Sequence, residues 1–328
     1  MILDTRLEAI NHWLQELNFI HYSLTPVAGD ASARRYFRLF QPQKESWIIM
    51  DAPPEKEGCA DFIYIANKLN ELGLNVPRIL FQDLKQGFLL LTDLGSSQYL
   101  YFLNVNSAQT LYEDAISALL MLQSKGSNSI NLKPYSHELL FQEMELFKDW
   151  YLKRHLGIHI TTELDSVFNL LANTALNQPQ VFVHRDYHSR NLMLTNQNNP
   201  GILDFQDAVK GPVTYDLVSL LRDCYIAWSQ EKIADWVSMY RNKATQLDIP
   251  VGQDLNEFLY WFDWMGIQRH LKAIGIFARL NYRDHKPNYL KDIPRTLAYI
   301  IRIGSQYNEL VDLNKILQSL PQSNMILQ

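Results

Sequence analysis

The chain has 328 residues, of which 47% are hydrophobic and 20% are charged, and its formal net charge is −5. This composition is ordinary for globular proteins and excludes collagenous, coiled-coil and disordered classes, and the acidic balance gives no support to nucleic-acid binding. The only cysteines, Cys59 and Cys224, are too few and too far apart for a disulfide framework or a paired zinc motif, so we expect a reducing, cytoplasmic compartment.

The first 94 residues predict a helix followed by a small antiparallel sheet. Asp4 and Glu8 interrupt the N-terminal segment and no run of 18 apolar residues occurs, so we expect neither a signal peptide nor a membrane span. The helix is indicated by apolar residues at helical spacing, namely Leu3, Leu7, Ile10, Leu14 and Leu17. Strand-like runs follow at Tyr36–Phe40, Trp47–Met50, Ile79–Phe81 and Phe88–Leu91. A helical segment between the second and third runs has an apolar face formed by Phe62, Ile65, Ala66 and Leu69.

Helical patterns dominate from about residue 96. They cover 107–123, 136–155, 163–176, 214–229, 231–247, 254–277 and 292–317, and one β-rich island at Val181–Phe205 interrupts them. The chain therefore predicts an α+β fold of two lobes, residues 1–94 and 95–328. A cleft between two such lobes is a common place for a ligand.

The β-rich island contains a hairpin that predicts a metal site. The polar run at 196–201 is a turn by composition. If this turn centres between Gln197 and Asn198, Asn191 faces Asp204, and directly opposed side chains lie roughly 4.5–5.5 Å apart. Two oxygen ligands at that separation suit Mg²⁺, which commonly takes one or two side chains together with substrate phosphates.

The segment His184–Asn191 carries the pattern H-R-D-x-x-x-x-N, and Asp204 follows in L-D-F thirteen residues later. In phosphoryl transfer such an aspartate orients the acceptor hydroxyl, while the asparagine and the second aspartate hold magnesium. We therefore expect Asp186 to be the catalytic base and Asn191 and Asp204 to be metal ligands. The alternative is a polar loop beside a buried hairpin, in which Asp186 only caps backbone amides.

Three neighbours of this motif are expected to assist it. His184 is expected to hold the catalytic loop by hydrogen bonds, and Arg190 either reaches the phosphates or lies on the surface. Asp216 lies near a predicted helix start, where a carboxylate suits the helix dipole, and is expected to support the loop.

These motifs resemble the aminoglycoside phosphotransferase family, the small-molecule branch of the protein-kinase-like fold. The resemblance covers most of the chain. Residues 29–38 fall at the nucleotide-covering loop, Gly87–Gly95 at the strand that leads to the adenine-facing hinge, Leu203–Ala208 at the metal loop and Gly211–Leu217 at the following helix start. The resemblance implies a bilobal fold that uses ATP and Mg²⁺, with a nucleotide-binding lobe at 1–94 and a helical lobe at 95–328.

Three further segments are similar to one subgroup, the anomeric N-acetylmuramate/N-acetylglucosamine kinases of bacterial cell-wall recycling. They are MDAPPE at 50–55, LDFQDAVKGP at 203–212 and GIFARLNYRDHKPNYLKDIPR at 275–295. The resemblance implies transfer to the C1 hydroxyl of an amino sugar and a pathway link to a sugar-1-phosphate nucleotidyltransferase.

The sequence departs from the general kinase pattern at two positions. Met50 stands where a strand lysine is usual, and the helix face that should carry a glutamate is apolar. The two absences agree, because a lysine without its glutamate would be an unpaired charge in the cleft. The subgroup also places methionine here, and a non-catalytic pseudokinase is the alternative.

Nucleotide contacts are expected from the covering loop, where Arg34 and Arg35 are either phosphate-binding cations or surface residues, and from the hinge. The expected residues are Asp30, Ser32, Arg34, Arg35, Leu91, Asp93 and Leu94.

The acceptor is expected to be neutral or acidic. Residues 265–305 hold eight basic side chains and only two acidic ones, Asp284 and Asp292, so a cationic aminoglycoside would be repelled. N-acetylmuramate carries a lactyl carboxylate, which an arginine fork can bind. The expected acceptor residues are Asp207, Arg279, Tyr282 and Arg283.

Alternatives remain open for the acceptor site. Asp207 can instead bind a second metal or close the loop, and Arg279 and Arg283 can belong to a solvated helix face. A kinase of choline, homoserine or an aminoglycoside shares every core residue.

Overall fold

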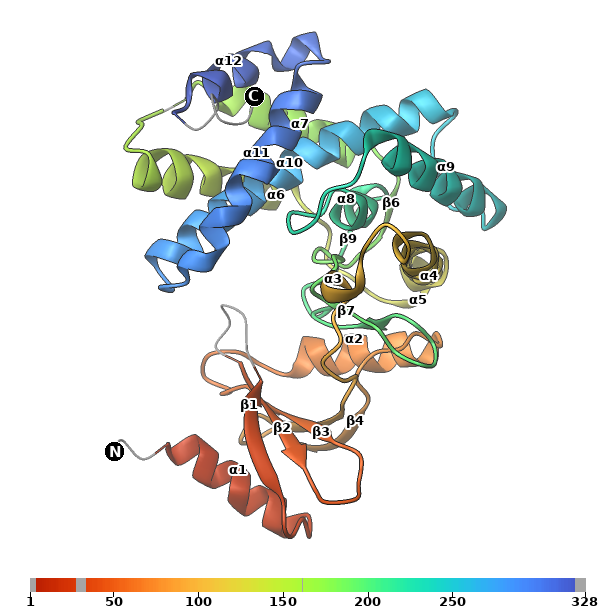
Figure 1. Ribbon diagram of the computed structural model, residues 1–328, viewed down its shortest axis with the longest axis vertical. Helices are drawn as coiled ribbons and strands as arrows, with labels where there is room; N and C mark the ends of the chain where they lie inside the picture. Colours follow the sequence, from red (N-terminus) through yellow and green to blue (C-terminus); the bar gives the residue numbers. More distant parts are fainter. Residues whose placement is uncertain (1–3, 28–33, 161, 322–328) are drawn as a thin grey trace.

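The computed structural model describes residues 4–27, 34–160 and 162–321. A five-stranded antiparallel sheet forms one end of the molecule, and the helices that follow residue 99 form the other (Figure 1). The strand order is β1-β2-β3-β5-β4. The strands are β1 (Ser23–Val27), β2 (Arg35–Phe40), β3 (Trp47–Asp51), β4 (Ile79–Asp83) and β5 (Phe88–Thr92).

The two faces of this sheet are covered by different elements because side chains alternate along each strand. Ile49, Phe88 and Leu90 pack with helix α1 (Thr5–Glu16) in one core cluster. Met50 and Leu89 belong instead to the larger cluster that contains helix α2 (Ala60–Glu71) and the helical end of the molecule. The face that carries Met50 is therefore the one that looks toward the rest of the chain.

The four predicted strands and both predicted helices of this region are confirmed, with ends that shift by one or two residues. Strand β1 was not predicted. Its sequence SLTPV has no regular apolar alternation and its side chains are exposed or half-buried. It lies at the edge of the sheet, and an edge strand is where a proline such as Pro26 is tolerated.

The remainder is mainly helical and is built around one long helix, α10 (Leu255–Tyr282), which packs on α6, α7, α8 and α11. The helices around it are α3 (Tyr99–Phe102), α4 (Ala108–Met121), α5 (Ser127–Ser129), α6 (His137–Leu146), α7 (Asp165–Leu176), α8 (Tyr215–Leu221), α9 (Gln230–Gln246), α11 (Ile293–Gly304) and α12 (Val311–Ser319). Leu122–Gly126 and Phe147–His155 are π-helical, and Pro287–Asp292 and Asn308–Leu310 form 3₁₀ turns. Within the described residues no helix combines the length and the apolar character needed to span a bilayer.

Two predicted helices are shorter than expected. The helix predicted over 214–229 ends at Leu221, because Asp223 accepts hydrogen bonds from the backbone N–H groups of Ser189 (3.0 Å) and Tyr225 (2.9 Å) and holds the chain in a turn. The helix predicted over 292–317 breaks after Gly304 into α11 and α12.

Two small antiparallel pairs carry the β-rich island. Strand β6 (Gln180–Val183) pairs with β9 (Val209–Pro212), and β7 (Leu192–Met193) pairs with β8 (Gly201–Ile202). The loops between them face the sheet end of the molecule in Figure 1. The hairpin also contacts the segment that connects the two ends, because the Leu194 N–H donates to the Ser97 carbonyl at 2.7 Å and Gln98 pairs with Met193.

Gly275 lets α10 approach the junction between α6 and the π-helical turn that begins at Phe147. A Cβ atom at this position would lie 2.5 Å from the Phe147 backbone nitrogen and nearer still to the Leu146 carbonyl carbon. Backbone atoms cannot rotate away as a side chain can, so α10 would have to move.

We predict that Gly275→Ala lowers the free energy of unfolding by about 1–3 kcal/mol, the usual cost of overpacking. Urea unfolding followed by circular dichroism measures it. Gly58→Ala is the matched control, since a Cβ there meets nothing within 4 Å, and it should leave stability unchanged or slightly higher. Equal midpoints for the two variants would contradict the packing argument.

Candidate active site

The loop after β6 is fixed by the buried carboxylate of Asp216 at the start of α8. Asp216 accepts hydrogen bonds from the backbone N–H groups of His184 (2.6 Å) and Arg185 (3.1 Å). Arg185 has a φ of 77°, a left-handed conformation that non-glycine residues adopt rarely and mostly at functional sites. Burial raises the pKa of Asp216 to about 7, and the two donated N–H groups oppose that shift. The support predicted for this loop is thus two direct hydrogen bonds.

Asp186 follows this loop and lies among cationic side chains. Burial alone would raise the pKa of its carboxyl, but the positive charges of Lys272, His188, Arg269 and Arg185 outweigh that effect and bring the pKa to about 2. Asp186 is therefore a carboxylate at any physiological pH.

Glu143 of α6 balances two of these cations. Its buried carboxylate pairs with Arg185 and with Lys272 (3.0 Å) and accepts a hydrogen bond from the Tyr135 hydroxyl. Lys272 also donates to the Tyr215 hydroxyl at 3.0 Å. Burial would raise the pKa of Glu143, but Lys272 and Arg185 lower it overall. A charged network that links α6, α8 and α10 thus surrounds the loop.

The hairpin register differs from the prediction by one residue. Leu192 pairs with Ile202, and the Leu203 N–H donates to the Asn191 carbonyl at 2.9 Å. Asn191 is then opposite Leu203, and regular alternation of side chains along the strand would place Asp204 on the other face of the hairpin. A φ of 64° at Asp204 breaks the alternation, and the Asn191 Nδ2 lies 3.4 Å from the Asp204 Oδ2. The predicted pair is therefore together, but through a backbone kink and not through opposed strand positions.

These two side chains fit a site for Mg²⁺ that depends on phosphate oxygens. The Asn191 Nδ2 also donates to the Asp186 carbonyl (3.0 Å), which leaves the amide oxygen as the ligand atom. Asp204 is exposed, and its Oδ1 accepts from the Gln206 side chain at 2.8 Å. The described residues contain no group of three or more His, Cys, Asp or Glu side chains able to hold a metal. Two oxygen ligands plus phosphates and waters is a usual arrangement for Mg²⁺.

The other two residues predicted for the loop have distinct settings. His184 is fully buried, and its Nδ1 lies 3.3 Å from the Asp186 N–H. Burial lowers the pKa of His184 to about 4, so the ring is neutral at pH 7. Arg190 lies between the rings of Tyr225 and Tyr289, with its guanidinium carbon 4.8 and 5.1 Å from their centroids.

Of the predicted covering-loop residues, Asp30 and Ser32 lie outside the described residues. Arg34 is buried and lies 3.6 Å from Glu57. Asp204 helps to raise the pKa of Tyr36, after the larger effect of burial, so this part of β2 lies near the metal ligands.

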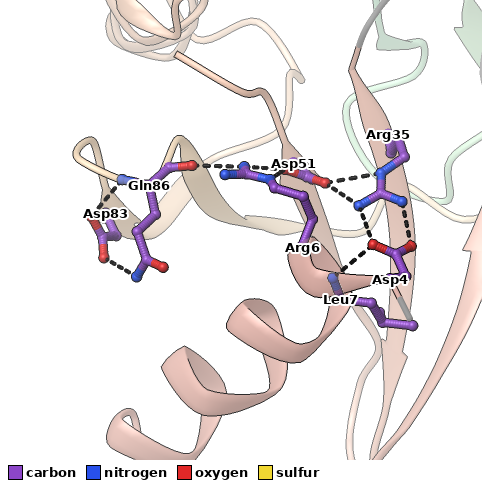
Figure 2. A network of polar contacts seen from close by, with 7 residues as sticks. All are labelled: Asp4, Arg6, Leu7, Arg35, Asp51, Asp83 and Gln86. Atoms are coloured by element: carbon purple, nitrogen blue, oxygen red, sulfur yellow. Dashed lines mark hydrogen bonds and ion pairs between the residues drawn. The ribbon is translucent and has the colours of Figure 1, made fainter. Parts of the chain in front are cut away.

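Arg35 points to the opposite face of the sheet. Figure 2 shows its guanidinium between Asp4 and Asp51, and it donates to the buried Asp51 carboxylate at 2.7 and 2.9 Å. Arg6 of α1 pairs with the same carboxylate. Arg35 thus joins α1 to the sheet, and the phosphate role predicted for it has no support in this geometry.

The hinge prediction needs a similar adjustment. Strand β5 is paired on both sides, with β3 and with β4, so the backbone edge of Leu91 is not open to adenine. The Asp93 carboxylate accepts hydrogen bonds from Arg38 (2.6 Å), Ser46 (2.7 Å) and the Gly95 N–H (2.8 Å). Of the hinge residues predicted to contact adenine, Asp93 and Leu94 therefore stay a prediction, and they lie beyond the end of the strand.

The position of the missing lysine is filled by packing. Met50 is fully buried, and Phe62 of α2 stacks on Phe205 of the metal loop with ring centroids 5.0 Å apart. This chain therefore has apolar packing in the region where the general kinase pattern has a lysine–glutamate ion pair.

A small hollow of about 70 Å³ opens beside Asp186. It is lined by Asp186, His188, Tyr215, Cys224, Tyr225, Arg269, Lys272, Ala273, Ile276 and Phe277. We name it the acceptor hollow.

None of the four predicted acceptor residues lines this hollow. Arg279 lines an adjoining hollow. Tyr282 contacts His155 (3.0 Å), Arg283 pairs with its neighbour Asp284, and Asp207 is exposed beside Gln206.

Sequence reasoning missed Glu143, and it counted Arg269 and Lys272 only as part of a basic stretch. Arg269, Lys272 and Ile276 recur at helical spacing along α10, and this stripe was the available signal. Glu143 comes from a helix some forty residues before the motif, and no local pattern marks it.

The sequence matches a family described as the phosphotransferase enzyme family over residues 23–248. An N-acetylmuramate/N-acetylglucosamine kinase of Pseudomonas aeruginosa is 44% identical over 334 residues, which cover 97% of this chain and 98% of that protein. The solved structure of choline kinase LicA from Streptococcus pneumoniae is similar with a TM-score of 0.67 at 13% identity, covering 93% and 100% of the two chains. LicA in complex with AMP gives a TM-score of 0.62 at 13% identity, covering 90% and 98%. The predicted kinase-like fold is confirmed.

The buried His184 predicts a loss of stability in acid. In the unfolded chain its pKa is near 6.5, whereas in the folded chain it is about 4. Between these values only the unfolded state takes up the proton, so the free energy of unfolding falls as pH drops from about 6.5 to about 4. This effect is worth up to about 3 kcal/mol.

We predict that His184→Gln loses less stability than the wild type between pH 6.5 and pH 4.5. Urea unfolding at both pH values measures the difference. His12→Gln, at a side chain that is 75% exposed, should behave as the wild type does. The same acid loss in His184→Gln would show that the group responsible lies elsewhere.

Proposed function

The chain belongs to the phosphotransferase enzyme family, and from that premise we propose that it transfers the γ-phosphoryl group of ATP to the C1 hydroxyl of an amino sugar. The acceptor is N-acetylmuramate or N-acetylglucosamine, the two sugars in the name of the P. aeruginosa relative. The observation that carries this proposal is the ionised Asp186 in the acceptor hollow, beside the Asn191–Asp204 pair.

Asp186 accepts a hydrogen bond from the acceptor hydroxyl. This hydrogen bond orients the hydroxyl so that a lone pair of the hydroxyl oxygen faces the phosphorus. With a pKa of about 2 Asp186 is a weak base, so orientation dominates, and the proton passes to it late, as the new O–P bond forms. Asn191 and Asp204 would hold Mg²⁺, which would supply positive charge to offset the charge on the transferred group.

Cations of the chain itself complete the phosphate site. Arg34, Arg190 and the backbone of the covering loop are proposed to meet the phosphate charge in place of the missing strand lysine. Residues 1–94 would bind the nucleotide, with adenine at Asp93 and Leu94. The complex of LicA with AMP supports nucleotide use.

Electrostatics favour a neutral or acidic acceptor over a cationic one. The acceptor hollow is lined by Arg269 and Lys272, and Arg185 also acts on Asp186, whose carboxylate is the only acidic group among the lining residues. An aminoglycoside or choline would bring further positive charge to this site. An N-acetylated sugar brings none.

The pathway partner that we propose follows from the class of the product. A sugar 1-phosphate is a substrate for a nucleotidyltransferase, and such an enzyme would act next. The two buried, free cysteines and the use of ATP support a cytoplasmic location.

We predict a C1-phosphate signal by phosphorus NMR after incubation with ATP, Mg²⁺ and N-acetylmuramate. Asp186→Asn should lower the rate by about 10²–10⁴-fold, since a positioned base is lost, and Asp204→Ala should abolish turnover. Both variants should remain folded at the assay temperature, which circular dichroism checks, so that the loss of turnover is not a loss of structure.

Two outcomes would contradict these predictions. Full turnover by both variants would refute the assigned roles, and a wild type that binds ATP but phosphorylates neither sugar would favour the pseudokinase. Asp312→Ala, at an exposed ion pair, is the control for nonspecific loss of charge.

A further inference from the structure

A second hollow adjoins the acceptor hollow and shares Lys272 and Ile276 with it. It has a volume of about 310 Å³ and is open to solvent. Its lining includes Glu143, Arg185, Lys272, Ile276 and Arg279. A ligand that reaches Asp186 in the first hollow can therefore extend into the second along α10.

Positive charge exceeds negative charge in the second hollow. Three cations line it, and Glu143 is its only carboxylate. Glu143 pairs with both Arg185 and Lys272, so Arg279 supplies charge that no lining group balances.

Among the described residues, Arg279 is a cation whose charge is not balanced by a neighbouring carboxylate. It is half-buried and makes no ion pair with a carboxylate in the described part of the chain, and its Nε is buried without a hydrogen-bond partner there. The next arginine on α10, Arg283, is by contrast paired with Asp284. Burying a guanidinium without a partner is costly, so an anionic ligand would gain from this position.

The helix geometry places Arg279 at a useful distance from the reacting hydroxyl. Lys272 and Arg279 are seven residues apart, which is about 10.5 Å along the axis. Helical side chains lean toward the N-terminus, so the long arginine reaches back toward Ile276 and Lys272. A sugar whose hydroxyl meets Asp186 would lie over Ile276 and present a substituent on its far side to Arg279.

We propose that Arg279 is a specificity-determining residue that binds the carboxylate of an acidic amino sugar. This inference rests on the proposed function and adds to it how the site separates two sugars. N-acetylmuramate differs from N-acetylglucosamine by a lactyl ether whose carboxylate a guanidinium fork can bind through two hydrogen bonds. The neutral sugar has no group for Arg279.

The first arm of the test compares kcat/KM for both sugars in the wild type, Arg279→Met and Arg302→Met. Arg279→Met should lose about 10- to 100-fold on N-acetylmuramate, the worth of a hydrogen-bonded charge pair, and change less than twofold on N-acetylglucosamine. Arg302 is an exposed arginine of the neighbouring helix α11, and its variant should match the wild type on both sugars.

The second arm changes the ligand instead of the protein. The methyl ester of N-acetylmuramate lacks the charge, so the wild type should use it about as poorly as Arg279→Met uses the acid. Arg279→Met should not distinguish ester from acid. Arg279→Lys keeps the positive charge but loses the two-pronged guanidinium. Its kcat/KM for N-acetylmuramate should lie between those of the wild type and Arg279→Met.

The outcomes separate this inference from the proposed function. Equal losses on both sugars, no loss on either, or a wild type that uses ester and acid alike would overturn the role of Arg279 while sugar phosphorylation stands. The ester arm needs no variant, so it decides even if Arg279→Met fails to fold. A wild type that phosphorylates neither sugar would overturn both.

Discussion

The positive charge gathered around Asp186 is the constraint on which the site depends. Arg185, Arg269 and Lys272 act on the half-buried carboxylate of Asp186 and keep it ionised, whereas burial alone would raise its pKa. The same cations would repel each other without Glu143, which lies between two of them. The ionisation of Asp186 and the preference that we propose for an uncharged or acidic acceptor therefore have one cause.

Backbone geometry brings the predicted catalytic and metal-binding residues together. Two residues in left-handed conformation, Arg185 and Asp204, bend the chain on either side of the hairpin. Asp216 supports the first bend by accepting two backbone hydrogen bonds. The second bend turns the Asp204 carboxylate toward Asn191. The site is thus assembled from strained segments that buried carboxylates and short strand pairs hold in place.

The sequence predicted what depends on local pattern and failed where distant residues decide. The segment His184–Asn191 and Asp204 are a short motif, so their grouping was predictable. The reason given for it was wrong by one residue of register, since the pattern carries no sign of the left-handed Asp204. Glu143 is brought to the loop only by the packing of α6 on α10, and no spacing along the chain encodes that contact.

In the fold, too, elements with a local apolar pattern were predicted, and features set by distant residues were not. Periodic apolar residues predicted α1, α2 and the inner strands, whereas β1 at the sheet edge has no such period. The end of α8 is set by Asp223, whose partner Ser189 lies thirty-four residues away. Arg35 was assigned to the nucleotide by its place in a loop motif, but its place on β2 turns it toward Asp51 and α1.

The most direct test of the central claim is the dependence of the rate on the charge of the acceptor. We would measure kcat/KM with ATP and Mg²⁺ for glucosamine, which is cationic at pH 7, and for its neutral N-acetyl derivative, at low and at high salt. The account predicts that the cationic sugar is at least about tenfold poorer and that salt narrows the gap by screening. Equal or better use of the cationic sugar would contradict it.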